Sequence, residues 1–246
     1  MNVFVSGGSR GIGRAIALRF ARDGAKRVAI GYFRSDSAAE QTAEDLRALG
    51  AEPTLVRGNI GSDRVLEEVA ALGPLDVLVH NAASGVSVPA LEATEKHWDW
   101  TVNTNARALL QLAQAAAPTM PAGSSIVAIS SLGAQRVLDN YTLVGTSKAA
   151  LEALVRYLAI ELAPGVRVNA VSGGVVDTDA LEHFPNREEM LAAGAANPVG
   201  RMVTPDDIAN AVAFLCSSEA DMVRGQTLIV DGGFSLLVGG GRSAQA

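Results

Sequence analysis

The N-terminal stretch Ser6-Gly7-Gly8-Ser9-Arg10-Gly11-Ile12-Gly13 constrains the fold most strongly. A short apolar segment, Val3–Val5, precedes it, and a segment with helical apolar spacing that includes Ile16 and Phe20 follows it. Glycines allow a tight turn and a close backbone approach, and a helix N-terminus attracts anionic groups. A strand, a glycine turn and a helix in this order predict a phosphate site of the dinucleotide-binding kind.

The rest of the chain repeats the alternation of strand and helix. We expect further strands at 28–32, 53–57, 75–79, 124–130, 166–171 and 227–230. Helical patterns separate them, including one capped by Ser37 with Glu40, one starting at Asp63, a long one from Thr94 to Ala117, and one from Pro205 to Ser217. This rhythm predicts an α/β protein with one doubly wound parallel (Rossmann) sheet of about seven strands and helices on both faces.

We expect a single domain over residues 1–238 and a disordered tail over 239–246, which is rich in glycine. Within the long helix, Trp98 and Trp100 cannot share a face, so we expect one in the core and the other at an interface. Asn105 is the polar residue of interest in that helix. It is either a functional amide or a core amide that bonds to the backbone.

Composition limits the function. The net charge of −6 argues against nucleic acid as a partner. No apolar run approaches membrane-spanning length, and the N-terminus lacks the pattern of a signal peptide, so we expect a cytoplasmic protein. The single cysteine, Cys216, lies in an apolar run and reads as a core residue. The three histidines are scattered, so we predict no metal site.

Two arginines indicate which dinucleotide would bind. An acid at the end of the second strand would bind a free ribose 2′-hydroxyl, whereas an arginine there accepts a 2′-phosphate. This chain has Phe33 and Arg34 at that point, and Arg10 lies in the glycine turn. The pair predicts NADPH rather than NADH, the alternative being two solvated arginines.

The stretch after the strand at 124–130 carries the second chemical signal. Tyr141 and Lys148 are seven residues apart, nearly two helical turns, so both side chains share a face if a helix begins near Tyr141. A phenol beside a cation at the end of a strand suits proton donation to an oxygen. The alternative is an exposed tyrosine and a solvated lysine.

These motifs together resemble the short-chain dehydrogenase/reductase family over nearly the whole chain. The pattern comprises the glycine turn, Asn81-Ala82-Ala83, Asn105, Ser131, Tyr141 with Lys148, and the glycine pair at 173–174. The family usually places its tyrosine four residues before the lysine, at position 144, which here is Val144. The longer spacing, together with Leu132-Gly133-Ala134, is similar to the type III, NADPH-dependent enoyl-acyl-carrier-protein reductases.

The resemblance implies reduction of the carbon–carbon double bond of a trans-2-enoyl thioester on acyl carrier protein, in fatty-acid or polyketide synthesis. It also implies a homotetramer. Alternatives are a carbonyl (3-oxoacyl-type) reductase and a nucleotide-sensing protein without catalysis. The implied catalytic residues are Tyr141, Lys148, Ser131 and Asn105, with Lys148 lowering the pKa of Tyr141. The implied cofactor-binding residues are Gly7, Ser9, Arg10, Gly11, Ile12, Gly13, Arg34, Asn59, Ile60, Asn81, Ala82, Ala83, Lys148, Gly174, Val176 and Thr178. The mixed segment 180–197, with Pro185, is expected to act as a mobile lid.

Overall fold

A computed structural model of the protein describes residues 1–178 and 187–237. All the strands of its single sheet are parallel, in the order β3-β2-β1-β4-β5-β6-β7. The strands are β1 Asn2–Ser6, β2 Arg27–Tyr32, β3 Glu52–Arg57, β4 Val77–His80, β5 Ser124–Ser131, β6 Val166–Gly173 and β7 Thr227–Val230. The predicted doubly wound sheet is therefore confirmed, with strand ends shifted by one or two residues.

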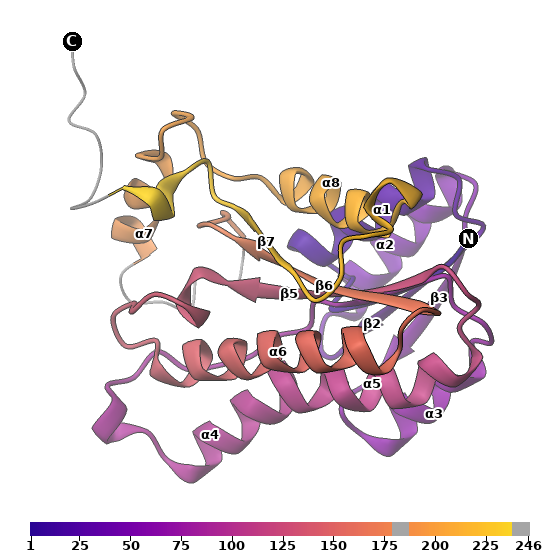
Figure 1. Ribbon diagram of the computed structural model, residues 1–246, viewed down its shortest axis with the longest axis horizontal. Coiled ribbons are helices and arrows are strands. Elements are labelled where there is room, and N and C mark those ends of the chain that lie inside the picture. Colours follow the sequence, from indigo (N-terminus) through magenta and orange to yellow (C-terminus); the bar gives the residue numbers. More distant parts are fainter. Residues whose placement is uncertain (179–186, 238–246) are drawn as a thin grey trace.

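The helices form a layer on each face of the sheet (Figure 1). One layer comprises α1 Gly11–Arg22, α2 Asp36–Ala48 and α8 Pro205–Cys216; the other comprises α3 Asp63–Ala71, α4 Glu95–Val102, α5 Ala108–Ala116 and α6 Thr142–Glu161. An apolar core lies between each helix layer and the sheet. Ile16 of α1 and Ile208 of α8 are fully buried in one core, and Leu109 of α5 and Leu151 of α6 in the other.

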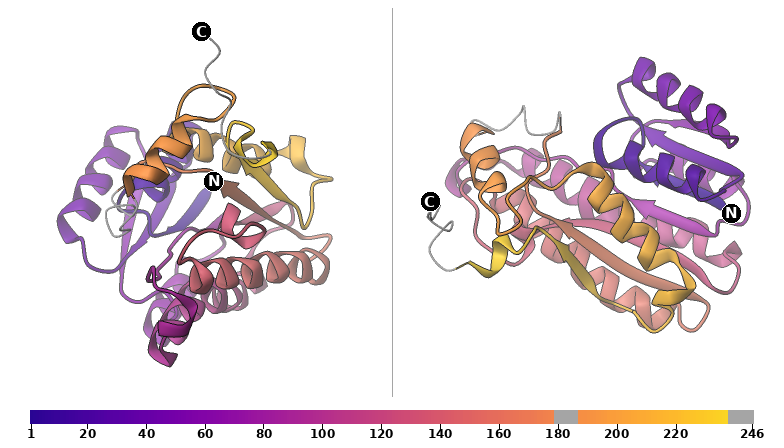
Figure 2. Two further views of the ribbon diagram at one scale, coloured as in Figure 1. Left: turned by 90° about the vertical axis from the view of Figure 1, so that its left-hand side faces the viewer. Right: turned by 90° about the horizontal axis from the view of Figure 1, so that it is seen from above.

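The carboxyl ends of the strands lie on the left in Figure 1 and face the viewer in the left view of Figure 2. Helix α6 begins at this edge, and α7 Arg187–Ala195 lies beside it on the other side of the sheet. Ligands of open parallel sheets bind at this edge, outside the carboxyl ends of the strands. The fold therefore brings the glycine turn, the end of β5 and the start of α6 to one side of the molecule.

The long helix predicted from 94 to 117 is interrupted. The side chain of Thr94 caps α4 and accepts a hydrogen bond from the amide of His97, which confirms its start. A π-helical turn, Asn103–Arg107, then separates α4 from α5, and a short 3-10 turn from Ala117 to Thr119 ends the segment. A π-helical turn contains one more residue than an α-helical turn, and apolar periodicity alone does not reveal it.

Two local predictions were wrong. Helix α2 begins at Asp36 with Ser35 as its N-cap, so Ser37 and Glu40 lie inside the helix and form no capping box. Trp98 and Trp100 are both exposed, at 44% and 46%, because α4 packs on α6 mainly through other residues and extends beyond the sheet. Neither tryptophan belongs to the core.

Candidate active site

The glycine turn connects β1 to α1 at the carboxyl edge of the sheet. Gly7 has a φ of +65°, a value that favours glycine. A Cβ on Gly13 would come within 2.1 Å of the carbonyl oxygen of Gly7, so only glycine fits there. Within residues 1–178 and 187–237, no side chain caps the N-terminus of α1. The turn therefore presents the backbone amides of the first helical turn, which can bind the phosphates of a dinucleotide.

The residues after β4 are held against this turn. The side-chain amide of Asn81 donates to the backbone oxygens of Ser6 and Gly7, both at 3.0 Å. The hydroxyl of Ser6 accepts from the amides of Asn81 and Ala82. The predicted dinucleotide residues of β1 and β4 thus form one rigid backbone surface.

The loop after β6 completes the predicted cofactor surface. Thr178 lies against Gly11, with 3.3 Å between its Cγ2 and a Cβ built at residue 11. Val176 is buried and pairs with Val203 in an isolated bridge. A Cβ on Gly174 would contact the backbone of Asp231 at 3.1 Å. Two segments far apart in the chain, the glycine turn and this loop, therefore lie side by side.

The other predicted cofactor residues sit at the same edge. The guanidinium of Arg34 lies over the ring of Phe33, 5.2 Å from its centroid. Arg10 is exposed at the N-cap of α1, and Ser9 is buried, its carbonyl accepting from Thr42. After β3, Asn59 accepts from the amide of Gly61, and Ile60 is buried. These positions fit the adenosine half of a dinucleotide.

The predicted catalytic hydroxyls are close to each other. Tyr141 is the N-cap residue of α6, and its hydroxyl donates to the hydroxyl of Ser131, the last residue of β5, at 3.3 Å. The tyrosine ring packs on the backbone of Gly133, where a Cβ would approach it to 2.5 Å. Gly133 therefore gives the ring its space beside Ser131.

Burial raises the pKa of Tyr141, and its hydrogen bond to Ser131 offsets this only in part. The expected lowering of this pKa is wrong: the pKa of Tyr141 is raised, with desolvation as the largest cause. A tyrosine that keeps its proton at neutral pH remains a hydrogen-bond donor, which suits it to hold a developing negative charge on an oxygen.

Lys148 is buried on α6, and its ammonium donates to the backbone oxygen of Ile129 at 2.7 Å. Burial lowers the pKa of Lys148 to about 8. The lysine therefore carries its charge at neutral pH, which is only about one pH unit below its pKa. An ammonium in this place can bind the hydroxyl groups of a sugar.

Asn105 lies in the π-turn, fully buried. Its side-chain amide donates to the backbone oxygen of Ser84 and to the hydroxyl of Ser147, both at 2.9 Å, and its side-chain oxygen accepts from the amide of Ser84. These bonds correspond to the core-amide alternative. Asn105 therefore positions the loop after β4 against α6.

Sequence reasoning missed His80, which is fully buried at the end of β4. One ring nitrogen lies 3.0 Å from the carbonyl oxygen of Asn105, and the other lies 3.2 Å from the hydroxyl of Ser6. Since a carbonyl only accepts, Nε2 carries the proton and Nδ1 accepts from Ser6. Burial, with the nearby charge of Lys148, lowers the pKa of His80 to about 4. A polar residue at the end of an apolar strand was the available signal.

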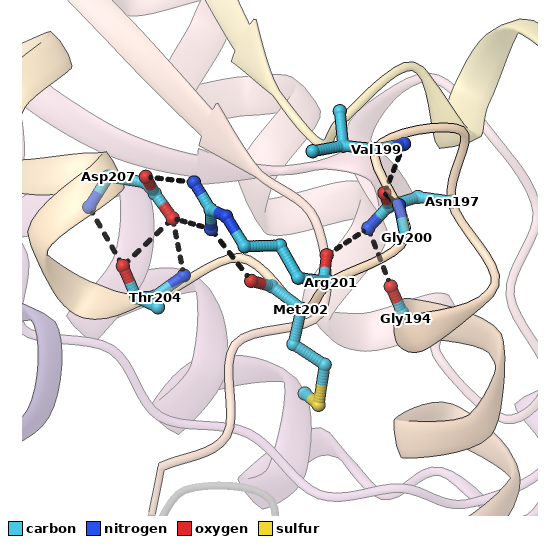
Figure 3. A network of polar contacts seen from close by, with 8 residues as sticks. All are labelled: Gly194, Asn197, Val199, Gly200, Arg201, Met202, Thr204 and Asp207. Carbon is cyan, nitrogen blue, oxygen red and sulfur yellow. Dashed lines mark hydrogen bonds and ion pairs between the residues drawn. The ribbon is translucent and has the colours of Figure 1, made fainter.

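Figure 3 shows the polar network that fixes the segment between α7 and α8. Asn197 is buried. Its side-chain NH₂ group donates to the backbone oxygens of Gly194 and Arg201, and its side-chain oxygen accepts from the backbone N–H groups of Val199 and Gly200. The guanidinium of Arg201 forms two hydrogen bonds with the carboxylate of Asp207. The C-terminal end of the expected lid is thus anchored.

The first part of that lid, residues 180–186, and the expected tail, residues 239–246, lie outside the described residues. Where the description resumes, the guanidinium of Arg187 donates to the carboxylate of Asp177 at 2.9 Å. This ion pair joins the start of α7 to the loop that carries Val176 and Thr178. The mobility of the lid stays a prediction.

This open parallel sheet, with its glycine turn and its serine, tyrosine and lysine group, defines a nucleotide-dependent oxidoreductase. A family model described as enoyl-(acyl carrier protein) reductase matches residues 7–235. The chain belongs to the short-chain dehydrogenase/reductase family of oxidoreductases. In the described part of the chain, no helix is both long and apolar enough to cross a membrane.

Individual relatives differ in their substrates. The chain is 38% identical to 1-cyclohexenylcarbonyl-CoA reductase of Streptomyces collinus over 95% of this chain and 86% of that one. It is 35% identical to a 3-oxoacyl-acyl-carrier-protein reductase of Staphylococcus aureus, over 94% and 97%. The crystal structure of a short-chain dehydrogenase from Burkholderia cenocepacia in complex with NADP is similar, with a TM-score of 0.87 and 35% identity over 95% and 97%.

Proposed function

We propose that the protein reduces the carbon–carbon double bond of a trans-2-enoyl thioester, with NADPH as the reductant. The observation that carries the proposal is the position of the phenol. Tyr141 donates to Ser131, whereas residue 144, where the family pattern places its tyrosine, is a buried valine. A tyrosine one turn earlier suits a carbonyl oxygen that is two bonds further from the carbon that accepts the hydride than in the reduction of a ketone.

The residues of the chain then have distinct roles. The cofactor would be held by the glycine turn, Asn81 and Lys148, and when bound it supplies the hydride that the β-carbon of the substrate accepts. Tyr141 donates a hydrogen bond to the thioester oxygen, where negative charge develops during reduction. Ser131 fixes the direction of that phenol, and Lys148 binds sugar hydroxyls. Arg10 and Arg34 would bind the 2′-phosphate.

Two comparisons support parts of this proposal. The named substrate of the Streptomyces collinus relative is an α,β-unsaturated acyl thioester, the same chemical class. The Burkholderia cenocepacia structure contains NADP. The Staphylococcus aureus relative favours the second candidate, reduction of a 3-oxoacyl thioester. That reaction needs a proton donor at the carbonyl that is itself reduced, and Val144 cannot supply one.

The test is a substrate panel on the purified protein. NADPH consumption should be measured with crotonyl and acetoacetyl thioesters, each on coenzyme A and on acyl carrier protein. We expect turnover of the crotonyl thioesters and slow or no turnover of the acetoacetyl ones. The opposite preference would establish the 3-oxoacyl reductase, and no turnover with NADPH binding intact would indicate a nucleotide-sensing protein.

We also propose acyl carrier protein as the partner that delivers the substrate, and a homotetramer as the assembly. Tyr157 and Ile160 of α6 are 71% and 77% exposed, so the outer face of this helix offers an apolar surface for a second copy. Sedimentation at several protein concentrations tests the assembly, and a monomer throughout would contradict it.

A further inference from the structure

A small, shallow hollow of about 20 Å³ opens beside Ser131, at the carboxyl ends of β5, β6 and β7. Five of its seven lining residues are polar: Ser131, Gln135, Arg136, Ser172 and Ser235. A hydrocarbon chain placed here would separate these polar groups from water and offer them no hydrogen bonds in return, which is unfavourable. The hollow therefore suits a part of the substrate that carries hydrogen-bonding groups.

Glu152 lies behind one wall of this hollow. It is on α6, one helical turn after Lys148, and its side chain is only 5% exposed. Its carboxylate accepts from the hydroxyl of Ser130 at 2.7 Å and from the side-chain amide of Gln135 at 2.9 Å. A carboxylate is costly to bury, and these two donors stabilise it.

The bond to Glu152 fixes the orientation of the Gln135 amide. An ionised carboxylate only accepts hydrogen bonds, so the NH₂ group of Gln135 must face Glu152 and its oxygen Oε1 must point away. Among the described residues, no donor reaches Oε1. The guanidinium of Arg136 donates to the backbone oxygen of Gln135 at 3.3 Å, which holds the residue from its other side.

We propose that Gln135 is a specificity-determining residue whose Oε1 accepts a hydrogen bond from an amide N–H in the thioester arm of the substrate, and that Glu152 is its positioning residue. The inference rests on the proposed function. Thioesters of coenzyme A and of acyl carrier protein share a pantetheine arm with an amide a few bonds from the sulfur. Ser131 and Gln135 line the same hollow, so with the thioester oxygen at Tyr141 and Ser131 the arm can reach Gln135.

The decisive experiment compares two small substrates that differ in this one donor. Crotonyl-N-acetylcysteamine has the amide N–H, and its N-methylated counterpart lacks it. For the wild-type protein we expect a KM roughly fivefold lower for the N–H substrate, as loss of one hydrogen bond implies. In Gln135→Leu the N–H substrate should lose this advantage, while kcat and the KM of the N-methyl substrate stay unchanged.

Glu152→Gln tests the positioning role. Glutamine can donate or accept, so the amide of Gln135 is free to turn, and the discrimination between the two substrates should fall. The double variant should match Gln135→Leu alone, because both changes act on one contact. Gln41→Leu, an exposed change on α2, is the matched control and should keep the wild-type discrimination.

Crotonyl-CoA and crotonyl-acyl-carrier-protein distinguish the two sources of the arm; if the arm is the recognised group, Gln135→Leu raises KM for both. Equal KM increases for the N–H and N-methyl substrates, or no increase, would overturn the inference. If the wild type reduces both small thioesters equally well, the inference fails and the proposed function stands. If it reduces no enoyl thioester while still binding NADPH, both fail.

Discussion

Val144 packs so closely on Gly85 that a Cβ built on residue 85 would lie 2.3 Å from its Cγ2 atom. The valine is 7% exposed and carries no hydrogen-bonding group. The space beside this turn of α6 is therefore filled by an apolar contact between the helix and the loop after β4. The phenol that can donate to a substrate lies one turn earlier, at Tyr141.

Removing this phenol should abolish most of the activity. We expect Tyr141→Phe to lower kcat for crotonyl thioester about a hundredfold to a thousandfold, because one transition-state hydrogen bond is lost. NADPH affinity should hardly change, since phenylalanine keeps the ring on Gly133. Steady-state kinetics and titration calorimetry measure the two effects.

Tyr157→Phe, at an exposed tyrosine of the same helix, is the control and should behave as wild type. Adding Val144→Tyr to Tyr141→Phe should not restore enoyl reduction, because the larger ring would displace Gly85. Near-normal turnover of Tyr141→Phe would instead identify Ser131 or a bound water as the group at the thioester oxygen.

Cofactor preference should depend on Arg34. Arg34→Ala removes a charge-assisted contact to the 2′-phosphate worth about 1.5–3 kcal/mol, so NADPH affinity should fall roughly tenfold or more. NADH affinity should stay nearly constant. Arg47→Ala, an exposed arginine in α2, should change neither. Equal losses for both cofactors from Arg34→Ala would show that Arg34 does not contact the phosphate.

The pH dependence of cofactor use should report Lys148. Since its pKa is lowered to about 8 by burial, the ammonium loses its proton as pH rises through that value. The kcat/KM for NADPH reflects groups of the free enzyme, so it should fall above about pH 8. Lys148→Ala should lack this decline and have both weaker NADPH binding and lower turnover.

Lys96→Ala, on the exposed part of α4, should keep the wild-type pH profile. Calorimetry on Lys148→Ala decides the role of the lysine. Unchanged NADPH affinity in that variant would mean that Lys148 does not bind the ribose.

His80 should make the free energy of unfolding depend on pH in the acidic range. In the unfolded chain it binds a proton below its ordinary pKa of 6.5, whereas in the folded protein it stays neutral down to about pH 4. Its contribution is therefore fully present above pH 6.5 and is lost as pH falls to 4. The difference amounts to roughly 3 kcal/mol of unfolding free energy.

Urea unfolding at several pH values measures this dependence. In His80→Asn, the unfolding free energy should fall less steeply between pH 6.5 and 4, because the contribution of the imidazole is lost. A slope identical to that of the wild type would mean that His80 is not the group that titrates.

The sheet could be predicted because its central strands are apolar runs between glycine or polar turns, and burial on both faces requires such runs. The edge strands β3 and β7 are partly exposed. The glycine turn and Tyr141 were also found, since their spacing is local. Contacts between segments that are far apart in the sequence could not be predicted. The pairing of Glu152 with Gln135, and of His80 with Ser6, depends on how α6 and β1 lie in space.

The other wrong predictions concerned the start of helix α2 and the burial of the two tryptophans. Ser35 and Ser37 are both acceptable N-caps, and only the backbone conformation distinguishes them. The exposure of Trp98 and Trp100 follows from the position of α4, which packs on α6 and extends beyond the sheet. Apolar spacing alone cannot show where a helix lies relative to the sheet.

The π-turn has a consequence for how this helix tolerates a change in length. A π-turn is equivalent to one inserted residue, so deleting one residue between 103 and 107 would convert it to ordinary α-helix. Because the wide π-turn accommodates the extra residue within itself, α4 and α5 would keep nearly the same rotation about the helix axis. Leu109 and Leu112 would therefore stay fully buried on α5, and the two tryptophans would stay exposed on α4. The deletion would change the turn around Asn105 and leave the sheet and its cores packed as before.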